Sequence, residues 1–165
     1  MEPLEVQELL DTFSYHVDDP YVVKAPKRCL LVKKVHCLEA AIVAAYLLPQ
    51  YKPLLLHLTT YNYSDAINGF IAHAIFVYED NGGFFSIGRS KFEALQGRLM
   101  PQRTVEDLAR DYGWSMMNVG RLFKEAGTVN LDEMDLRFDW RQQICDITMI
   151  EEKIISYRKK LNLSF

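Results

Sequence analysis

The sequence predicts an α+β fold in which a central helix bearing a cysteine packs on an antiparallel sheet and the C-terminal third is helical. From residue 38 to residue 48 the only charged side chain is Glu39, so a helix here is apolar on every face and belongs in the centre. Two apolar stretches meet at Asn81-Gly82, a pair typical of a β-hairpin turn. Beyond residue 104, apolar residues recur at helical spacing.

The overall composition is that of an ordinary globular protein. With 165 residues, 49% of them hydrophobic and 25% charged, we expect one domain over residues 1–165. The net charge of −3 indicates no general affinity for nucleic acid or for anionic membranes. No secretion signal begins the sequence and no apolar run reaches the ~18 residues of a bilayer span, so we expect a cytoplasmic location.

The first elements lead to Cys37. Residues 4–13 carry apolar side chains at helical spacing and predict an amphipathic helix. A basic run from Lys24 to Lys34 follows, and the apolar helix then begins at Cys37 and ends before Pro49. Unpaired N–H groups at a helix N-terminus favour an anion, so we expect a lowered thiol pKa at Cys37, with Lys33 or Lys34 adding positive potential.

The middle of the chain predicts an antiparallel meander packed on this helix. Residues 52–60, 70–78 and 84–88 are apolar and of strand length. Residues 61–69 are polar and turn-like, and residues 79–83 form the hairpin turn.

The last third predicts three helices. Thr104 begins the first, with Asp107 three residues later in a variant of the capping box. Ser115 caps a second helix over residues 116–126, which Gly127 ends. Isoleucines at helical spacing predict a terminal helix within residues 139–163.

The side chains that carry chemistry are cysteine and histidine. Thiol catalysis needs a thiolate, a base and a group that orients the base. Cys37 is the candidate nucleophile, His73 on the second strand is the candidate base and His57 on the first strand is its rival. Either histidine is also explained, without any catalytic role, as a hydrogen-bonded buried residue. Cys29 and Cys145 are expected to be small buried hydrophobes, and no CxxC pair, metal motif or cofactor motif is present.

The order of these elements resembles the core of the transglutaminase-like superfamily, which shares its Cys-His arrangement with papain-like thiol enzymes. The matching segments are residues 36–41, His73, residues 87–91, Leu95, residues 97–98, Pro101 and residues 103–112. They are similar to a group of uncharacterised bacterial transglutaminase-like proteins, and the likeness spans roughly residues 13–112. The resemblance implies that Cys37 and His73 form a catalytic pair. Glu39 and Arg89, which lie in the matching segments, are the expected substrate contacts.

The sequence departs from that family at the third catalytic residue. The family has an Asp on the strand after the His, and here its place falls at or near Gly88. Residues 86–91 contain no acid. Ser90 is the expected substitute, with Ser86 as the alternative. Either hydroxyl stabilises an imidazolium less than a carboxylate does.

We therefore expect a hydrolase or acyltransferase that acts on a peptide, amide or ester through Cys37 and His73. Two alternatives stay open. The first is a catalytically inactive transglutaminase-like module that binds a protein partner. The second is a helix-turn-helix DNA-binding unit over residues 104–126, because Ala109, Gly113, Val119 and Leu122 have the spacing of that motif.

Overall fold

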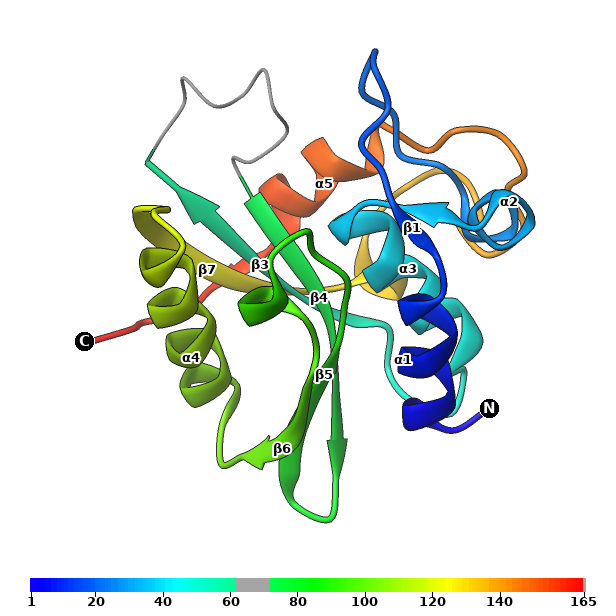
Figure 1. Cartoon of the computed structure of the whole chain (residues 1–165). Helices are drawn as coiled ribbons and strands as arrows, with labels where there is room; N and C mark the ends of the chain where they lie inside the picture. The colour runs from blue at the N-terminus through cyan, green and yellow to red at the C-terminus, as the bar shows by residue number, and fades with distance from the viewer. Residues whose placement is uncertain (62–71, 165) are drawn as a thin grey trace.

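A six-stranded antiparallel sheet organises the computed structural model, which describes residues 1–61 and 72–164 (Figure 1). Within these residues the strand order is β6-β5-β4-β3-β7-β8. The strands are β3 (Leu54–Thr60), β4 (Ala72–Asp80), β5 (Gly83–Ile87), β6 (Arg98–Gln102), β7 (Phe123–Asn130) and β8 (Lys159–Lys160). A separate parallel pair joins β1 (Ser14–Tyr15) to β2 (Lys34–Val35).

The helices cover both faces of the sheet. They are α1 (Pro3–Asp11), α2 (Pro26–Val32), α3 (Cys37–Leu47), α4 (Val105–Asn118) and α5 (Ile150–Tyr157), with short 3₁₀ turns η2 (Glu93–Leu95) and η3 (Leu131–Glu133). Helices α1, α2 and α3 lie on one face and α4 on the other (Figure 1). Ile150 and Ile154 of α5 pack in the same core as α3. The predicted helices at residues 4–13, 37–48 and after Thr104 are confirmed.

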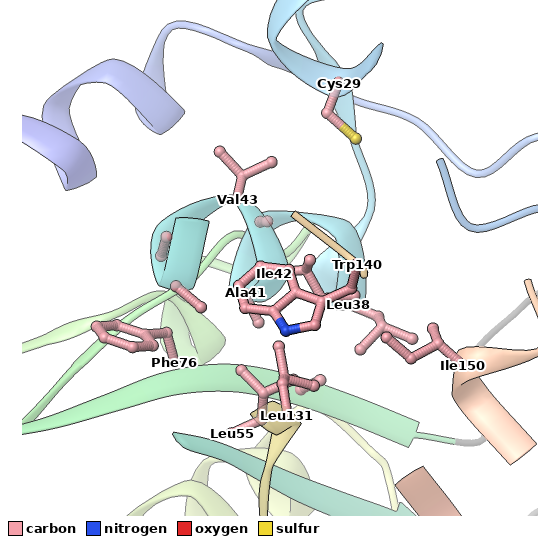
Figure 2. Packing of buried hydrophobic residues seen from close by; sticks show 14 of the residues in the cluster. Cys29, Leu38, Ala41, Ile42, Val43, Leu55, Phe76, Leu131, Trp140 and Ile150 are labelled. Carbon is pink, nitrogen blue, oxygen red and sulfur yellow. The ribbon is translucent and has the colours of Figure 1, made fainter. Parts of the chain in front are cut away.

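Helix α3 is buried along most of its length. Every residue from Leu38 to Ala45 is buried, as expected for a helix that is apolar all round. Figure 2 shows side chains of α2, the sheet and the C-terminal segment around it, among them Cys29, Phe76 and Trp140. The predicted position of this helix at the centre of the fold is confirmed.

Alternation along the strands assigns the two strand histidines to opposite faces. In β4, Ala74 and Phe76 lie in the core of α3, whereas Ile75 and Val77 lie in the core of α4. Successive strand residues point to opposite faces, so His73 is on the α4 side. The expectation that His73 shares a face with Ile75 and Val77 is confirmed, and Ile71 lies outside the described residues.

The same rule applied to β3 places His57 on the α3 side. Leu55 lies in the core of α3, whereas Leu56 and Leu58 lie in the core of α4. The register between β3 and β4 sets His57 opposite Ala74. His57 is therefore on the same face of the sheet as the helix that begins at Cys37.

The predicted meander of β3, β4 and β5 is confirmed. Asn81 and Gly82 both have positive φ angles, 50° and 77°, which a tight two-residue hairpin requires. The predicted turn at residues 61–69 lies, apart from Tyr61, outside the described residues.

The predicted second helix over residues 116–126 is wrong. Helix α4 continues through Ser115 to Asn118, and Gly120, at φ +81°, follows its end. Residues 123–130 then form β7, which pairs with β3 along the sheet. Backbone pairing with a central strand overrides the helical spacing. Residues 104–126 therefore do not form a helix-turn-helix unit.

The predicted terminal helix is much shorter than expected, so the C-terminal third is not wholly helical. Only α5 is an α-helix within residues 139–163, and β8 pairs with β7 directly after it. Ile144 is 71% exposed, because the segment before α5 turns instead of continuing a helix. Cys145, expected to be buried, is exposed, whereas Cys29 is buried as predicted.

No helix among the described residues is both long and apolar enough to cross a lipid bilayer.

Replacing Ile42 with Ala is expected to lower the free energy of unfolding by about 2–5 kcal/mol, because the side chain is fully buried in α3 and its removal leaves a cavity. Chemical denaturation measures the change. Leu31→Ala is the matched control, because Leu31 is 74% exposed on α2. Equal effects of the two substitutions would contradict the central position of α3.

Candidate functional site

Cys37 is the first residue of α3, and a reciprocal cap fixes its position. The Nδ1 atom of His36 accepts the N–H of Glu39 at 3.4 Å, and the Glu39 carboxylate accepts the N–H of His36 at 3.0 Å. These two bonds satisfy donors that a helix N-terminus otherwise leaves unpaired. His36 therefore caps the helix that carries Cys37.

Glu39 is an internal anchor of this helix start. Its side chain is 0% exposed, and its carboxylate accepts the backbone N–H of Lys24 at 2.6 Å and the Lys24 ammonium at 2.8 Å. Such a carboxylate has no surface left for a ligand. Glu39, expected to contact substrate, instead holds the start of α3 in position.

The Cys37 thiol lies against the beginning of β4. Its Sγ donates to the Ala72 carbonyl over 3.9 Å. Burial raises the pKa of Cys37 to about 11, and the N–H groups of Ala74 and Leu38 only partly oppose this. The Glu151 carboxylate raises this pKa further. The expected lowering of the thiol pKa is therefore wrong, and the resting side chain is a neutral thiol.

His73 is held as a neutral imidazole with a defined tautomer. Its Nε2 lies 2.7 Å from the carbonyl oxygen of Leu95. A carbonyl can only accept, so Nε2 carries the hydrogen and Nδ1 carries the lone pair. Burial lowers the pKa of His73 to about 4. Nδ1 is therefore the nitrogen able to accept a proton at neutral pH.

Cys37, His73 and Ser90 line one small hollow of about 20 Å³, roughly the room of one water molecule. The pairing of β5 with β4 runs only from Phe76 to Asp80, so β5 does not cover the start of β4, where Cys37 and His73 line the same hollow. Within the described residues, no hydrogen bond joins the Cys37 thiol to His73. The three predicted catalytic residues thus line one hollow without a hydrogen bond between sulfur and imidazole.

The carbonyl that orients His73 belongs to a well-anchored turn. Arg98 donates to the carbonyls of Ala94 and Gln96 on either side of Leu95, at 2.7 and 2.8 Å. The Tyr112 hydroxyl also donates to the Gln96 carbonyl, at 2.6 Å, and its ring packs against His73. Sequence reasoning missed this partner because a backbone carbonyl has no residue-type signature.

Gly88, where the family pattern places its Asp, has no room for a side chain. A Cβ atom there would lie 2.6 Å from Cγ2 of Ile75. The side-chain amide of Gln7 binds the backbone of Gly88 in both directions, at 3.0 and 3.1 Å. A carboxylate at this position would require Ile75 to move.

The two serines considered as substitutes have other partners. Ser86 shares a 2.8 Å hydrogen bond with the Tyr112 hydroxyl, and Ser90 accepts the N–H of Phe92 at 3.1 Å. In the described chain neither hydroxyl is bonded to His73. Ser90 still lines the hollow beside Cys37.

His57, the rival base, lines a second hollow of about 20 Å³ together with Cys37, Tyr21 and Glu151. Its Nδ1 accepts an N–H of Arg158 at 2.9 Å. A guanidinium has no lone pair, so Nδ1 cannot also bind a proton while this bond exists. Burial and the adjacent Arg158 cation lower the pKa of His57 to about 3. This geometry does not suit a base.

Arg89, the other expected substrate contact, follows β5. One of its terminal N–H groups donates to the Phe13 carbonyl at 2.9 Å, and its Nε has no partner among the described residues. It lines neither hollow beside Cys37. The structure thus ties Arg89 to the segment after α1.

The described residues contain no group of three or more His, Cys, Asp or Glu side chains placed to hold a metal ion. No protein-family profile matches the sequence, and no curated protein matches it either.

Three buried histidines, His36, His57 and His73, make stability depend on pH. Burial depresses their pKa values in the folded protein, so at these sites only the unfolded chain binds protons as the pH falls below about 6.5. Their contribution to stability is complete above that pH and is lost progressively toward pH 4. Each histidine contributes a slope on the order of 1 kcal/mol per pH unit.

We expect His73→Gln to flatten the dependence of the unfolding free energy on pH between 6.5 and 4, as measured by denaturation at several pH values. His16→Gln, at an exposed histidine, is the control and should keep the slope. A wild-type slope retained in His73→Gln would show that His73 is not a buried neutral group.

Proposed function

We propose that this protein is a thiol-dependent hydrolase or acyltransferase for an amide or ester, related to the transglutaminase-like enzymes. One observation carries the proposal: Cys37, at the N-terminus of a buried helix, shares a hollow with a histidine whose proton-accepting nitrogen is fixed by the Leu95 carbonyl.

The pKa values favour general-base catalysis over a preformed ion pair. A thiol with a pKa of about 11 and an imidazole with a pKa of about 4 both rest in their neutral forms. His73 Nδ1 therefore accepts the thiol proton as the sulfur attacks the carbonyl carbon of the substrate. The new S–C bond forms while the π electrons of the carbonyl move onto its oxygen.

Collapse of this intermediate completes acylation. The oxygen lone pair re-forms the carbonyl, the C–N or C–O bond to the leaving group breaks, and the imidazolium of His73 returns its proton to the leaving atom. Cys37 is then a thioester, which water or an amine attacks with the same proton transfers. The Leu95 carbonyl accepts the Nε2–H throughout, but a dipole stabilises the imidazolium less than a carboxylate does.

The second candidate is a catalytically inactive module that keeps the arrangement and binds a protein partner. The raised thiol pKa and the lack of a sulfur–imidazole hydrogen bond in the described chain favour it. The two candidates differ in whether Cys37 can be acylated.

Acylation of Cys37 by p-nitrophenyl acetate tests the choice. The experiment uses Cys145→Ser, which removes the exposed thiol, and locates the acetyl group by peptide mass spectrometry. We expect Cys37 to be acetylated, and His73→Ala to slow this step by about 100-fold or more, because the general base is lost.

His16→Ala is the control for the loss of an imidazole, since the His16 side chain is exposed and lines neither hollow beside Cys37. Circular dichroism confirms that each variant is folded. If Cys37 stays free of acetyl groups in the Cys145→Ser protein while Cys145 is acetylated in the unsubstituted protein, the inactive module is the answer.

The pH dependence of alkylation is a separate test of the resting state. Because the pKa of Cys37 is raised to about 11, its reaction with iodoacetamide should keep accelerating well above pH 9. Exposed Cys145 in the same digest serves as the internal reference. A rate for Cys37 that levels off near neutral pH would show a preformed thiolate.

A further inference from the structure

We infer that the Nε2–H of His57 donates a hydrogen bond to the carbonyl oxygen of the substrate and to the oxyanion that forms when Cys37 attacks. The inference rests on the proposed function and names a residue that stabilises its intermediate. Sequence reasoning placed His57 only as an alternative base.

The tautomer of His57 follows from its partner. Arg158 can only donate, so the 2.9 Å bond between its guanidinium and Nδ1 requires the lone pair at Nδ1. A neutral imidazole with its lone pair at Nδ1 carries its hydrogen at Nε2. His57 is thus the same tautomer as His73, but its partner occupies the other nitrogen: His57 has its Nε2–H group free, whereas His73 has its Nδ1 lone pair free.

That N–H group is buried and unused. His57 is 1% exposed, and its Nε2 has no hydrogen-bond partner in the part of the chain that the structure describes. Leaving a buried donor unpaired costs the full desolvation of that group, so folded proteins rarely do so without a functional reason. An acceptor oxygen supplied by a ligand would satisfy it.

The position of His57 suits a carbonyl oxygen bound at the nucleophile. The hollow that it lines is also lined by Cys37, Leu38 and Ala74. Cys37 also lines the hollow that contains His73. The thiol therefore borders one hollow that holds a proton acceptor and another that holds a hydrogen-bond donor, and acyl transfer requires both groups.

The neighbouring cation favours this role. Arg158 donates to the far side of the imidazole and is itself paired with Glu125, so the cation polarises the ring toward Nε2–H. Glu151 lines the same hollow, and burial raises the pKa of its carboxyl.

Two substitutions test the roles of the two ring nitrogens of His57 independently. His57→Asn keeps an acceptor near the position of Nδ1 for Arg158 but has nothing at the position of Nε2. His57→Gln reaches the position of Nε2 with an amide N–H. Both are made in the Cys145→Ser background and checked for folding by circular dichroism.

Two reagents separate oxyanion stabilisation from thiol reactivity. Attack on p-nitrophenyl acetate develops an oxyanion, whereas displacement of iodide from iodoacetamide develops none. We expect His57→Asn to slow acetylation of Cys37 by about 10²- to 10³-fold, with its alkylation rate unchanged. His57→Gln should recover much of the acetylation rate.

The outcomes distinguish this inference from the proposed function. If the wild type is acetylated at Cys37 and His57→Asn is acetylated equally fast, the role of His57 is overturned while the thiol chemistry stands. If both reactions slow equally in His57→Asn, His57 acts on the thiol and the inference is also overturned. If wild-type Cys37 is never acetylated, the proposed function and the inference fall together.

Nitrogen-15 NMR of the wild-type imidazoles provides a check that needs no variant. We expect a protonated Nε2 and an unprotonated Nδ1 for His57, which supports the donor role. A protonated Nδ1 would overturn it even if the His57 variants do not fold.

Discussion

Burial of helix α3 is the constraint on which the rest of the structure depends. Its residues from Leu38 to Ala45 are all buried, so the chain must cover every side of it. Helices α1 and α2, one face of the sheet and the C-terminal segment supply that cover. The N-terminus of the helix is partly covered as well, at Cys37, and burial raises the pKa of this thiol. Packing that stabilises the fold thus keeps the Cys37 side chain a neutral thiol.

Two histidines of the same Nε2–H tautomer, each with a different nitrogen left free by its partner, line the two hollows beside this thiol. The partner of His73 is a carbonyl that can only accept, and the partner of His57 is a guanidinium that can only donate. Each partner therefore decides which ring nitrogen carries the hydrogen. His73 presents a lone pair and His57 presents an N–H group. Burial keeps both neutral near pH 7, so the assignment is set by geometry and does not change with ordinary pH.

The site differs from the transglutaminase-like pattern at the group that orients the base. Gly88 packs against Ile75 where that pattern has an Asp. The Leu95 carbonyl takes over the contact with His73, and Arg98 and Tyr112 anchor the turn that contains it. A backbone acceptor orients an imidazole as well as a carboxylate does, but it adds no full charge to stabilise the imidazolium. Under the proposed function, replacing the carboxylate with a carbonyl slows the proton transfers, but it leaves the orientation of the His73 imidazole unchanged.

The sequence by itself determined the elements whose signals are local: the all-apolar helix from Cys37, the Asn81-Gly82 hairpin and the helix capped by Thr104. Each rests on contacts between residues close in the chain. Tertiary structure alone decided that residues 123–130 become β7, because pairing with β3 outweighs helical spacing. It also decided the site. Which nitrogen of His73 or His57 carries a hydrogen depends on Leu95 and Arg158, and partners so distant in sequence leave no periodic pattern from which to predict them.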